Sequence, residues 1–209
     1  MSVARPGKII GIGRNYREHA AELGNPVPAK PLLFLKPPTA VIGDGAAIVL
    51  PPESGQVDFE GEIGVVIGRP LRRATESEAR AGIAGITCVN DVTARDLQRT
   101  EEQWTRAKGF DTFCPIGPRV VPVDPPRFDE LEVFSRVNGH QRQHGRARDM
   151  VFSILALVCV VSHVMTLEPG DLIATGTPAG VGPLAPGDVV EVEIPGVGVL
   201  RNPVVREAR

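Results

Sequence analysis

The feature that most constrains the fold is residues 58–68, where apolar and polar positions alternate. One set of alternate positions holds Phe59, Ile63, Val65 and Ile67. The other set holds Asp58, Glu60, Glu62 and Gly64. Side chains of a strand point to opposite faces in turn, so this pattern predicts a β-strand with one face in the core.

The same alternation places Glu60 and Glu62 on one face, about 7 Å apart along the strand. Two carboxylates this close raise each other's pKa unless a cation lies between them, and Mg²⁺ or Ca²⁺ prefers oxygen ligands. The pair therefore suggests a metal site. A strand with a solvated acidic face is the commoner arrangement. Gly61 and Gly64 favour the site, because glycine weakens a strand unless something must approach the backbone closely.

Composition favours one mainly β domain over residues 1–209, with residues 1–6 as a flexible N-terminal tail. The 23 glycines, 20 prolines and 4 % aromatic residues predict many turns between short strands. The net charge of −2, with no basic tract, predicts no nucleic-acid surface. Three distant cysteines without Cys-x-x-Cys spacing, and the lack of a signal peptide, indicate a cytoplasmic protein with reduced thiols.

Two segments predict helices away from any site. Residues 151–167 are apolar but short for a membrane span, and polar residues interrupt them, so we interpret them as a buried core helix and expect no membrane association. His163 near its end is an ordinary core or C-terminal histidine in this interpretation. Residues 75–84 predict a second helix, with Ser77 as its candidate N-cap.

A candidate general base lies near the N-terminus. Residues 15–23 predict a short helix that stops at Gly24. His19 and Glu22 are three residues apart and share one face of that helix, so the carboxylate can orient the imidazole and raise its basicity. A plain surface pair of the same two residue types is the alternative.

Further polar residues follow predicted strands. Asp91 ends the apolar run 83–89 and is well placed to supply a third carboxylate. Arg95 and Gln98 share one face of the next helical turn, where Arg95 can hold a substrate carboxylate bidentately. Lys36 directly follows the short buried strand 32–35 and either points into a cleft or is an ordinary strand-end lysine. Lys108 lies among small and aromatic residues, which is unusual for a solvated lysine.

Other patterns predict turns and surfaces. Asn138-Gly139 is a hairpin signal, and Pro-Gly-Asp at 169–171 and 186–188 marks two turns before apolar strands. The glycine-rich loop 175–182 is no P-loop, but its N–H groups can form a nest for a carboxylate. We interpret two further sets as solvent-facing: His140 with His144, and Glu191 with Glu193.

Six blocks, taken together and in order, resemble the fumarylacetoacetate hydrolase family from about Ile9 to Gly196. They are Gly-Arg-Asn-Tyr-x-x-His (13–19), Phe-Leu-Lys-Pro (34–37), Asp-Phe-Glu-x-Glu (58–62), Asn-Asp-Val-Thr-Ala-Arg-Asp-Leu-Gln (90–98), Lys-Gly-Phe-Asp-Thr-Phe (108–113) and Thr-Gly-Thr-Pro-x-Gly-Val-Gly (175–182). The chain lacks the N-terminal domain of larger members and so resembles compact acylpyruvase-type and isomerase-type ones. Residues 146–149 depart from the expected hydroxyl-rich turn.

The resemblance implies an α+β, mostly β fold, a mixed β-sandwich roll with a few short helices and a mobile lid, assembled as a homodimer around Mg²⁺ or Mn²⁺. By position, the implied metal ligands are Glu60, Glu62 and Asp91. The implied catalytic residues are His19 and Glu22 on the lid, and Lys108 near the metal. The implied substrate-binding residues are Arg14, Tyr16, Lys36, Arg95, Gln98, Gly176 and Thr177.

The implied function is that of a metal-dependent enzyme acting on a small 2-oxo (di)acid through a metal-stabilised enolate. Acylpyruvate C–C bond hydrolysis or oxaloacetate-type decarboxylation is favoured, because His19 and Glu22 supply a base for water. Isomerisation or hydration of 2-hydroxyhepta-2,4-diene-1,7-dioate in aromatic catabolism is the alternative, since residues 108–115 resemble such members. A non-enzymatic metal- or ligand-binding module is the alternative of a different class.

Overall fold

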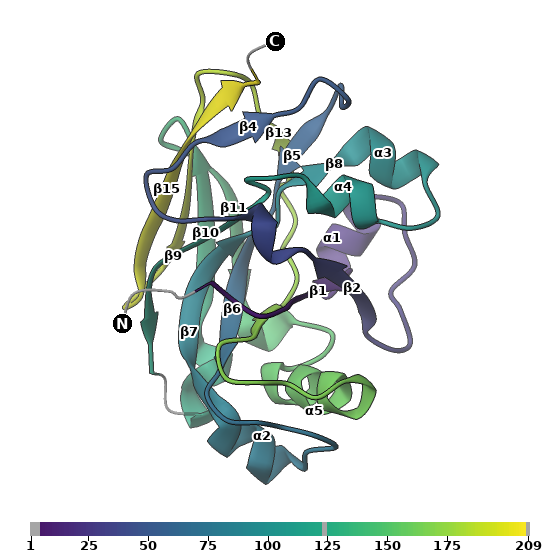
Figure 1. Ribbon diagram of the computed structural model, residues 1–209, viewed down its shortest axis with the longest axis vertical. Helices are drawn as coiled ribbons and strands as arrows, with labels where there is room; N and C mark the ends of the chain where they lie inside the picture. Colours follow the sequence, from purple (N-terminus) through teal and green to yellow (C-terminus); the bar gives the residue numbers. More distant parts are fainter. Residues whose placement is uncertain (1–4, 123–124, 208–209) are drawn as a thin grey trace.

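The computed structural model describes residues 5–122 and 125–207 and shows two large β-sheets facing each other, with short helices at their margins (Figure 1). The seven-stranded sheet has the order β2 (Leu32–Lys36), β1 (Ile9–Gly13), β12 (Leu172–Ala174), β6 (Gly61–Ile67), β7 (Ile83–Asn90), β9 (Cys114–Val121) and β3 (Val41–Ile42). The five-stranded sheet has the order β11 (His140–Arg146), β10 (Glu132–Val137), β14 (Val189–Ile194), β15 (Gly198–Arg206) and β4 (Ile48–Leu50).

A third sheet of three short strands, β13 (Gly182–Pro183), β5 (Val57–Phe59) and β8 (Thr93–Ala94), completes the β structure. The helices are α1 (Arg17–Glu22), α2 (Glu76–Gly82), α3 (Arg95–Thr100), α4 (Thr105–Gly109) and α5 (Ile154–Val164), with short 3₁₀ turns at Pro38–Ala40, Pro125–Glu130 and Ala147–Asp149. Strand pairs β1–β12, β15–β4 and β3–β9 are parallel and the others antiparallel. The predicted mixed, mostly β sandwich with short helices is confirmed.

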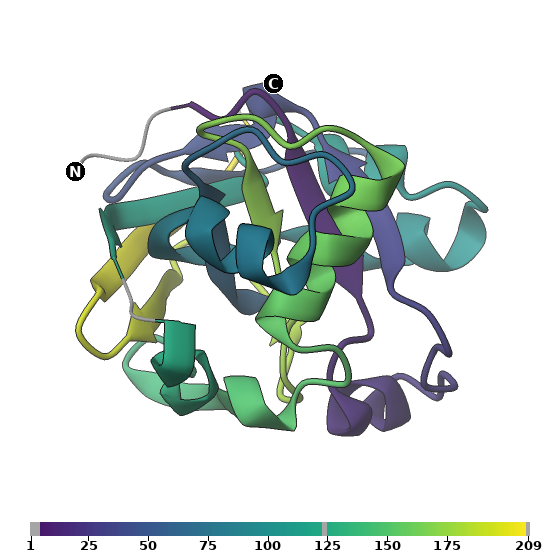
Figure 2. The same cartoon turned by 90° about the horizontal axis from the view of Figure 1, so that it is seen from below.

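The main core lies between the two large sheets and extends to α5. Ile63 and Val65 of β6 meet Val192 and Ile194 of β14 there, and Leu157 of α5 packs into the same cluster. Figure 2 shows α2 and α5 packed side by side across one end of the sandwich. The predicted core helix at 151–167 is confirmed, and none of the helices in the described ranges has the length and apolarity to cross a bilayer.

The prediction of one continuous strand at residues 58–68 is wrong. The chain forms two strands, β5 and β6, that belong to different sheets and join at Glu60. The Glu60 N–H donates to Asn90 Oδ1 (2.9 Å), and its carbonyl accepts from the Asp91 N–H (2.8 Å). Both faces of the stretch are buried, because β6 is covered on each side. The alternation of apolar and polar residues continues through the junction, and for this reason the sequence pattern predicted a single strand.

Other local predictions have mixed outcomes. Strand β2 forms as predicted, but it is an edge strand and not buried, with Leu35 53 % exposed. The predicted hairpin is confirmed, because Asn138 (φ 53°) and Gly139 (φ 77°) both take the left-handed conformation that such a turn requires. Residues 1–4 of the expected N-terminal tail lie outside the described residues. At its inner end, the Arg5 Nε donates to the Pro38 carbonyl and Pro6 is buried.

Two of the three cysteines lie in the protein core. Cys88 and Cys114 are buried free thiols, and burial raises the pKa of each to about 12.

Helix α2 forms, but its N-cap is Thr75 and not Ser77. Thr75 Oγ1 accepts from the Glu78 N–H, while the Glu78 carboxylate accepts from the Thr75 N–H, which is a complete capping box.

The capping box gives a direct stability test. We expect Thr75→Ala to lower the free energy of unfolding by about 1 kcal/mol, because it removes the side-chain acceptor for an otherwise unpaired helix N–H. Ser77→Ala at the exposed second position should leave it within about 0.5 kcal/mol of the original value. Urea denaturation of both variants measures the difference, and equal effects would contradict the assignment of the cap.

Candidate active site

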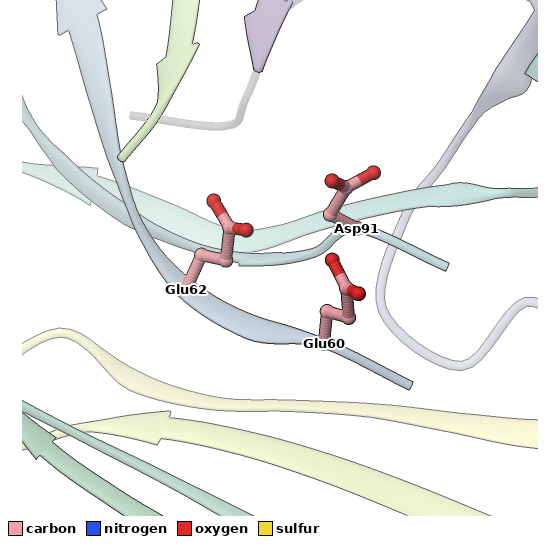
Figure 3. A group of neighbouring side chains, drawn as sticks. All are labelled: Glu60, Glu62 and Asp91. Atoms are coloured by element: carbon pink, nitrogen blue, oxygen red, sulfur yellow. The ribbon is translucent and has the colours of Figure 1, made fainter. Parts of the chain in front are cut away.

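Three buried carboxylates converge where the sheets meet. Glu60 lies at the junction of β5 and β6, Glu62 follows on β6, and Asp91 comes directly after β7. Strands β6 and β7 pair side by side, with Gly61 opposite Asn90, which brings Asp91 beside Glu60. One oxygen from each carboxylate lies within 4.8 Å of the others, and Figure 3 shows all three groups turned toward a common region. The expected convergence of these side chains is therefore observed.

Two buried lysines neutralise part of this acidic cluster. The Lys36 Nζ donates to Asp91 Oδ1 at 2.5 Å. The Lys108 Nζ donates to Asp91 Oδ2 at 2.6 Å and to Glu60 Oε2 at 2.9 Å. Burial lowers the pKa of Lys108, but the neighbouring Asp91 and Glu60 carboxylates outweigh it and raise the pKa above its usual value. Lys108 is therefore a fixed charge in the site.

The third buried cation is Arg95 at the start of α3. Its Nε donates to Asp58 Oδ2 at 2.8 Å, and its two terminal nitrogens donate to Glu60 and Gln98. Asp58, which the sequence showed only as a polar position on the alternating strand, is thus a partner of this guanidinium. Sequence reasoning predicted that Arg95 holds a substrate carboxylate, whereas here its donors are directed to protein groups.

Glu62 differs from the other two carboxylates. It accepts a hydrogen bond from the Gly176 N–H (2.8 Å) and has no ion-pair partner among the described residues. Burial raises its pKa well above the usual value, and the charges of Asp91 and Glu60 raise it further. For Glu60, burial also raises the pKa, but Lys108 and Arg95 outweigh it and the pKa is lowered.

The donor atoms of the cluster suit a divalent cation. Four buried carboxylates, those of Asp58, Glu60, Glu62 and Asp91, face three buried cationic side chains. Of these four carboxylates, Glu62 is the one without an ion-pair partner among the described residues. An all-oxygen donor set is the kind that Mg²⁺ and Mn²⁺ prefer. The residues present therefore fit the ion that the sequence predicted.

The predicted His–Glu pair lies in the wall of the same site. His19 on α1 is 4 % exposed, and its Nδ1 lies 3.4 Å from Glu22 Oε2. Burial lowers the pKa of His19 below its usual value, although Glu60 and Glu22 act in the opposite direction. The lowered pKa favours the neutral form of the imidazole. The Glu22 carboxylate also accepts the Gly180 N–H (3.0 Å to Oε1), which attaches α1 to the loop before β13.

A cavity of about 440 Å³ joins these groups. Its apolar wall includes Phe34 and Trp104, whose rings meet edge to face with centroids 5.5 Å apart. The lining residues are Ile12, Gly13, Arg14, His19, Glu22, Leu23, Asn25, Phe34, Glu60, Glu62, Asp91, Arg95, Gln98, Arg99, Trp104, Lys108 and Thr177. A cavity of this size fits a small polar ligand.

The remaining predicted site residues divide into two groups. Arg14, Gln98 and Thr177 line the cavity, whereas Tyr16, Lys36 and Gly176 do not. Lys36 lies behind Asp91, and Gly176 acts through its N–H to Glu62. Tyr16 is buried near Glu62, and its hydroxyl has no hydrogen-bond partner among the residues that the structure describes. Its pKa is raised by burial and by Glu62.

Sequence reasoning did not identify Asn25, Phe34, Arg99 and Trp104 as lining residues, or Gln143 as a contact of the Thr177 loop. Phe34 is the first residue of the Phe-Leu-Lys-Pro block (34–37), and its place in that block was the sequence feature that could have identified it. The residues predicted to be surface groups are confirmed as such: His144 pairs with Glu132 (2.7 Å), and Glu193 pairs with Arg136 (2.6 Å), all outside the cavity.

A mixed β-sandwich with a buried acidic cluster, paired cations and a buried histidine around one cavity is an arrangement typical of an enzyme active site. Residues 8–205 match the family model described as "Fumarylacetoacetate (FAA) hydrolase C-terminal". The chain therefore belongs to the fumarylacetoacetate hydrolase family and is an enzyme of that family.

Solved structures and a curated relative agree with this assignment. The 5-carboxymethyl-2-hydroxymuconate delta-isomerase of Mycobacterium smegmatis is 47 % identical, with a TM-score of 0.90, over 98 % of this chain and 81 % of its own. The 2-hydroxyhepta-2,4-diene-1,7-dioate isomerase of Mycobacterium marinum is 48 % identical, with a TM-score of 0.89, over 98 % and 77 %. The mitochondrial oxaloacetate tautomerase FAHD2A of Bos taurus is 43 % identical over 97 % and 68 %.

The buried ion pairs predict a large stability effect. We expect Lys36→Met to lower the free energy of unfolding by about 3–5 kcal/mol, because Asp91 is then left with one cation fewer in a dry environment. Arg80→Met breaks the exposed pair with Glu76 and should cost less than about 1 kcal/mol. Urea denaturation in a chelating buffer compares the two, and similar losses would contradict the account of the buried cluster.

Proposed function

We propose that this enzyme catalyses proton transfer at C3 of a short 2-oxo (di)acid or its 2-hydroxy-dienoate form, as a tautomerase or isomerase that uses Mg²⁺ or Mn²⁺. The observation that carries the proposal is the buried His19, hydrogen-bonded to Glu22, in the same cavity wall as Glu60, Glu62 and Asp91. The two similar solved structures and the bovine relative are named for shifts of this kind, which supports the same class of reaction here.

Glu60, Glu62 and Asp91 would hold the cation, with Glu62 contributing the carboxylate that has no ion-pair partner in the described part of the chain. When bound, a divalent cation supplies Lewis-acid stabilisation of negative charge on the carboxylate and C2 oxygen of a 2-oxo acid. Lys108 adds a fixed positive charge at the cavity wall, below the ring of Phe34 (4.8 Å from Nζ to the ring centroid). Both positive charges favour an acidic substrate.

His19 moves the proton. Donation of its Nδ1–H to Glu22 leaves the lone pair on Nε2, so this nitrogen is the base that takes the proton from C3 and returns it to a new position. Because burial holds the pKa of His19 below its usual value, the base form exists at neutral pH without prior deprotonation. Glu22 fixes the ring and is itself held by the Gly180 N–H.

Hydrolysis of an acylpyruvate or decarboxylation of oxaloacetate is the second candidate. The observation that favours it is the His19–Glu22 hydrogen bond, since an oriented imidazole can also activate water. Both reactions would use the same charge stabilisation at C2. The substrate group beyond C3 would then decide the outcome, and Arg14, Asn25 and Arg99 are polar lining residues available to contact it.

A substrate panel tests the proposal. The protein with Mg²⁺ is incubated with oxaloacetate, acetylpyruvate and 2-hydroxyhepta-2,4-diene-1,7-dioate, and tautomerisation, cleavage and CO₂ release are followed separately. We expect proton shifts to be fastest, and His19→Gln to lower their kcat/KM by about a hundredfold or more. The acid limb of kcat/KM should fall with decreasing pH and have its midpoint below 6.5, because only the neutral imidazole acts as base.

His163→Gln is the matched control, since this histidine is exposed at the end of α5, where its Nδ1 is hydrogen-bonded to the Cys159 carbonyl. It should leave every rate unchanged. Cleavage or CO₂ release much faster than any proton shift would reverse the order of the two candidates. Full activity of His19→Gln would remove His19 from the mechanism.

The cation site has its own test. We expect Glu62→Gln to abolish stabilisation by Mg²⁺, which for the original protein is about 2.7 kcal/mol at a hundred times Kd. In a chelating buffer the variant should be at least as stable as the original, because it removes a buried carboxylate without an ion-pair partner. Glu193→Gln, from the other Glu-x-Glu strand, is the control. Equal Mg²⁺ stabilisation of all three proteins, measured by thermal denaturation, would exclude Glu62 as a ligand.

A further inference from the structure

One buried amide outside the cavity lining connects the acidic strand to the loop before β13. Gln143 on β11 is 1 % exposed. Its Oε1 accepts from the Gly61 N–H (2.9 Å), and its Nε2 donates to Thr177 Oγ1 and to the Pro178 carbonyl (2.7 Å each). Thr177 Oγ1 donates in turn to the Gly61 carbonyl (3.0 Å). The three residues Gly61, Gln143 and Thr177 thus form a closed hydrogen-bonded ring.

The chemistry of the ring specifies glutamine at position 143. The Gly61 N–H can only donate, and the Pro178 carbonyl can only accept. The side chain between the Gly61 N–H and the Pro178 carbonyl must therefore carry both an acceptor and a donor on its terminal group, at the distance that a glutamine side chain spans. A carboxylate lacks the donor and a thioether lacks both at useful strength, so neither Glu nor Met can replace the amide.

At one end of the ring is the peptide that separates two of the converging carboxylates. Gly61 stands between Glu60 and Glu62, and both its N–H and its carbonyl are bound by the ring. A β-carbon at Gly61 would lie 2.0 Å from Ser135 Oγ, so any larger residue at this position of the strand would have to displace that hydroxyl. The ring therefore fixes the backbone from which both glutamates project.

The other end of the ring holds the loop that attaches α1. Thr177 lines the cavity, and three residues later the Gly180 N–H binds Glu22. The carbonyl of Arg142, next to Gln143 on β11, lies where a β-carbon of Gly180 would be. Strand β11 thus positions the loop at two adjacent residues, and the loop positions the partner of His19.

We propose that Gln143 is a positioning residue, which touches neither substrate nor cation but sets both the Glu60–Glu62 pair and the Glu22 contact. The proposal rests on the proposed function for its catalytic consequence. Removing the amide should loosen the acidic strand and the loop together. Partners of this kind, one step behind the ligands of a metal, typically change affinity by 10- to 100-fold when removed.

The test compares Gln143→Met with Gln141→Met, an exposed glutamine of the same strand. Hydrogen exchange of the whole protein is measured by mass spectrometry for peptides that contain residues 60–62 and 176–180. Mn²⁺ titration gives cation affinity, and steady-state kinetics gives kcat and KM separately. For Gln143→Met we expect faster exchange in both peptides, Mn²⁺ affinity lower by about tenfold, and kcat lower by about tenfold with KM changed much less. Gln141→Met should match the original protein.

Thr177→Val breaks the same ring at another corner and serves if Gln143→Met folds poorly. Because the two side chains act through one ring, the double variant should bind Mn²⁺ no more weakly than Gln143→Met alone. Unchanged exchange in both peptides with unchanged Mn²⁺ affinity would overturn the proposal, as would additive losses. If the original protein binds no Mn²⁺, the proposed function fails, and the exchange comparison still decides the positioning role.

Discussion

The structure depends on the mutual neutralisation of charges that no single segment could bury. A lone ion in a protein interior costs several kcal/mol, and the cost is offset only when a partner is held in good geometry. Lys36 arrives from β2, Asp91 from the end of β7, Arg95 from α3 and Lys108 from α4. Segments far apart in the sequence therefore reach the same place, and the junction of β5 and β6 at Glu60 lies at its centre.

Local patterns in the sequence predicted local structure well. The hairpin at Asn138-Gly139 and the core helix α5 depend on interactions between residues that are close in the sequence, so both could be predicted from it. The break at Glu60 was not predictable, because alternation looks the same whether one strand continues or two strands meet in different sheets. The choice of Thr75 over Ser77 as N-cap depended on which residue's hydroxyl reached a free N–H, and both residue types are good caps.

The site was predictable in its residue types but not in its pairing. The position of Asp91 beside Glu60 and Glu62 was expected, because Asp91 ends a predicted strand and the six sequence blocks resemble one family. The hydrogen bonds that Arg95 donates to Asp58 and Glu60 were not predicted, because a guanidinium can bind a carboxylate of the protein or of a substrate equally well. Gln143 lies on a strand of mostly exposed polar residues. Its burial results from contact with the loop that contains Thr177, which the sequence of the strand does not reveal.

The attachment of α1 through a main-chain group has a consequence for divergence within such a scaffold. Glu22 binds the N–H of Gly180, which every non-proline residue would supply, although the space at this position admits only glycine. The side chains of neighbouring loop positions take no part in that bond. Substitutions at Ala179 and Val181, on either side of Gly180, can therefore change the surface beside α1 without breaking its attachment, whereas Thr177 on the same loop is tied to Gln143 and Gly61.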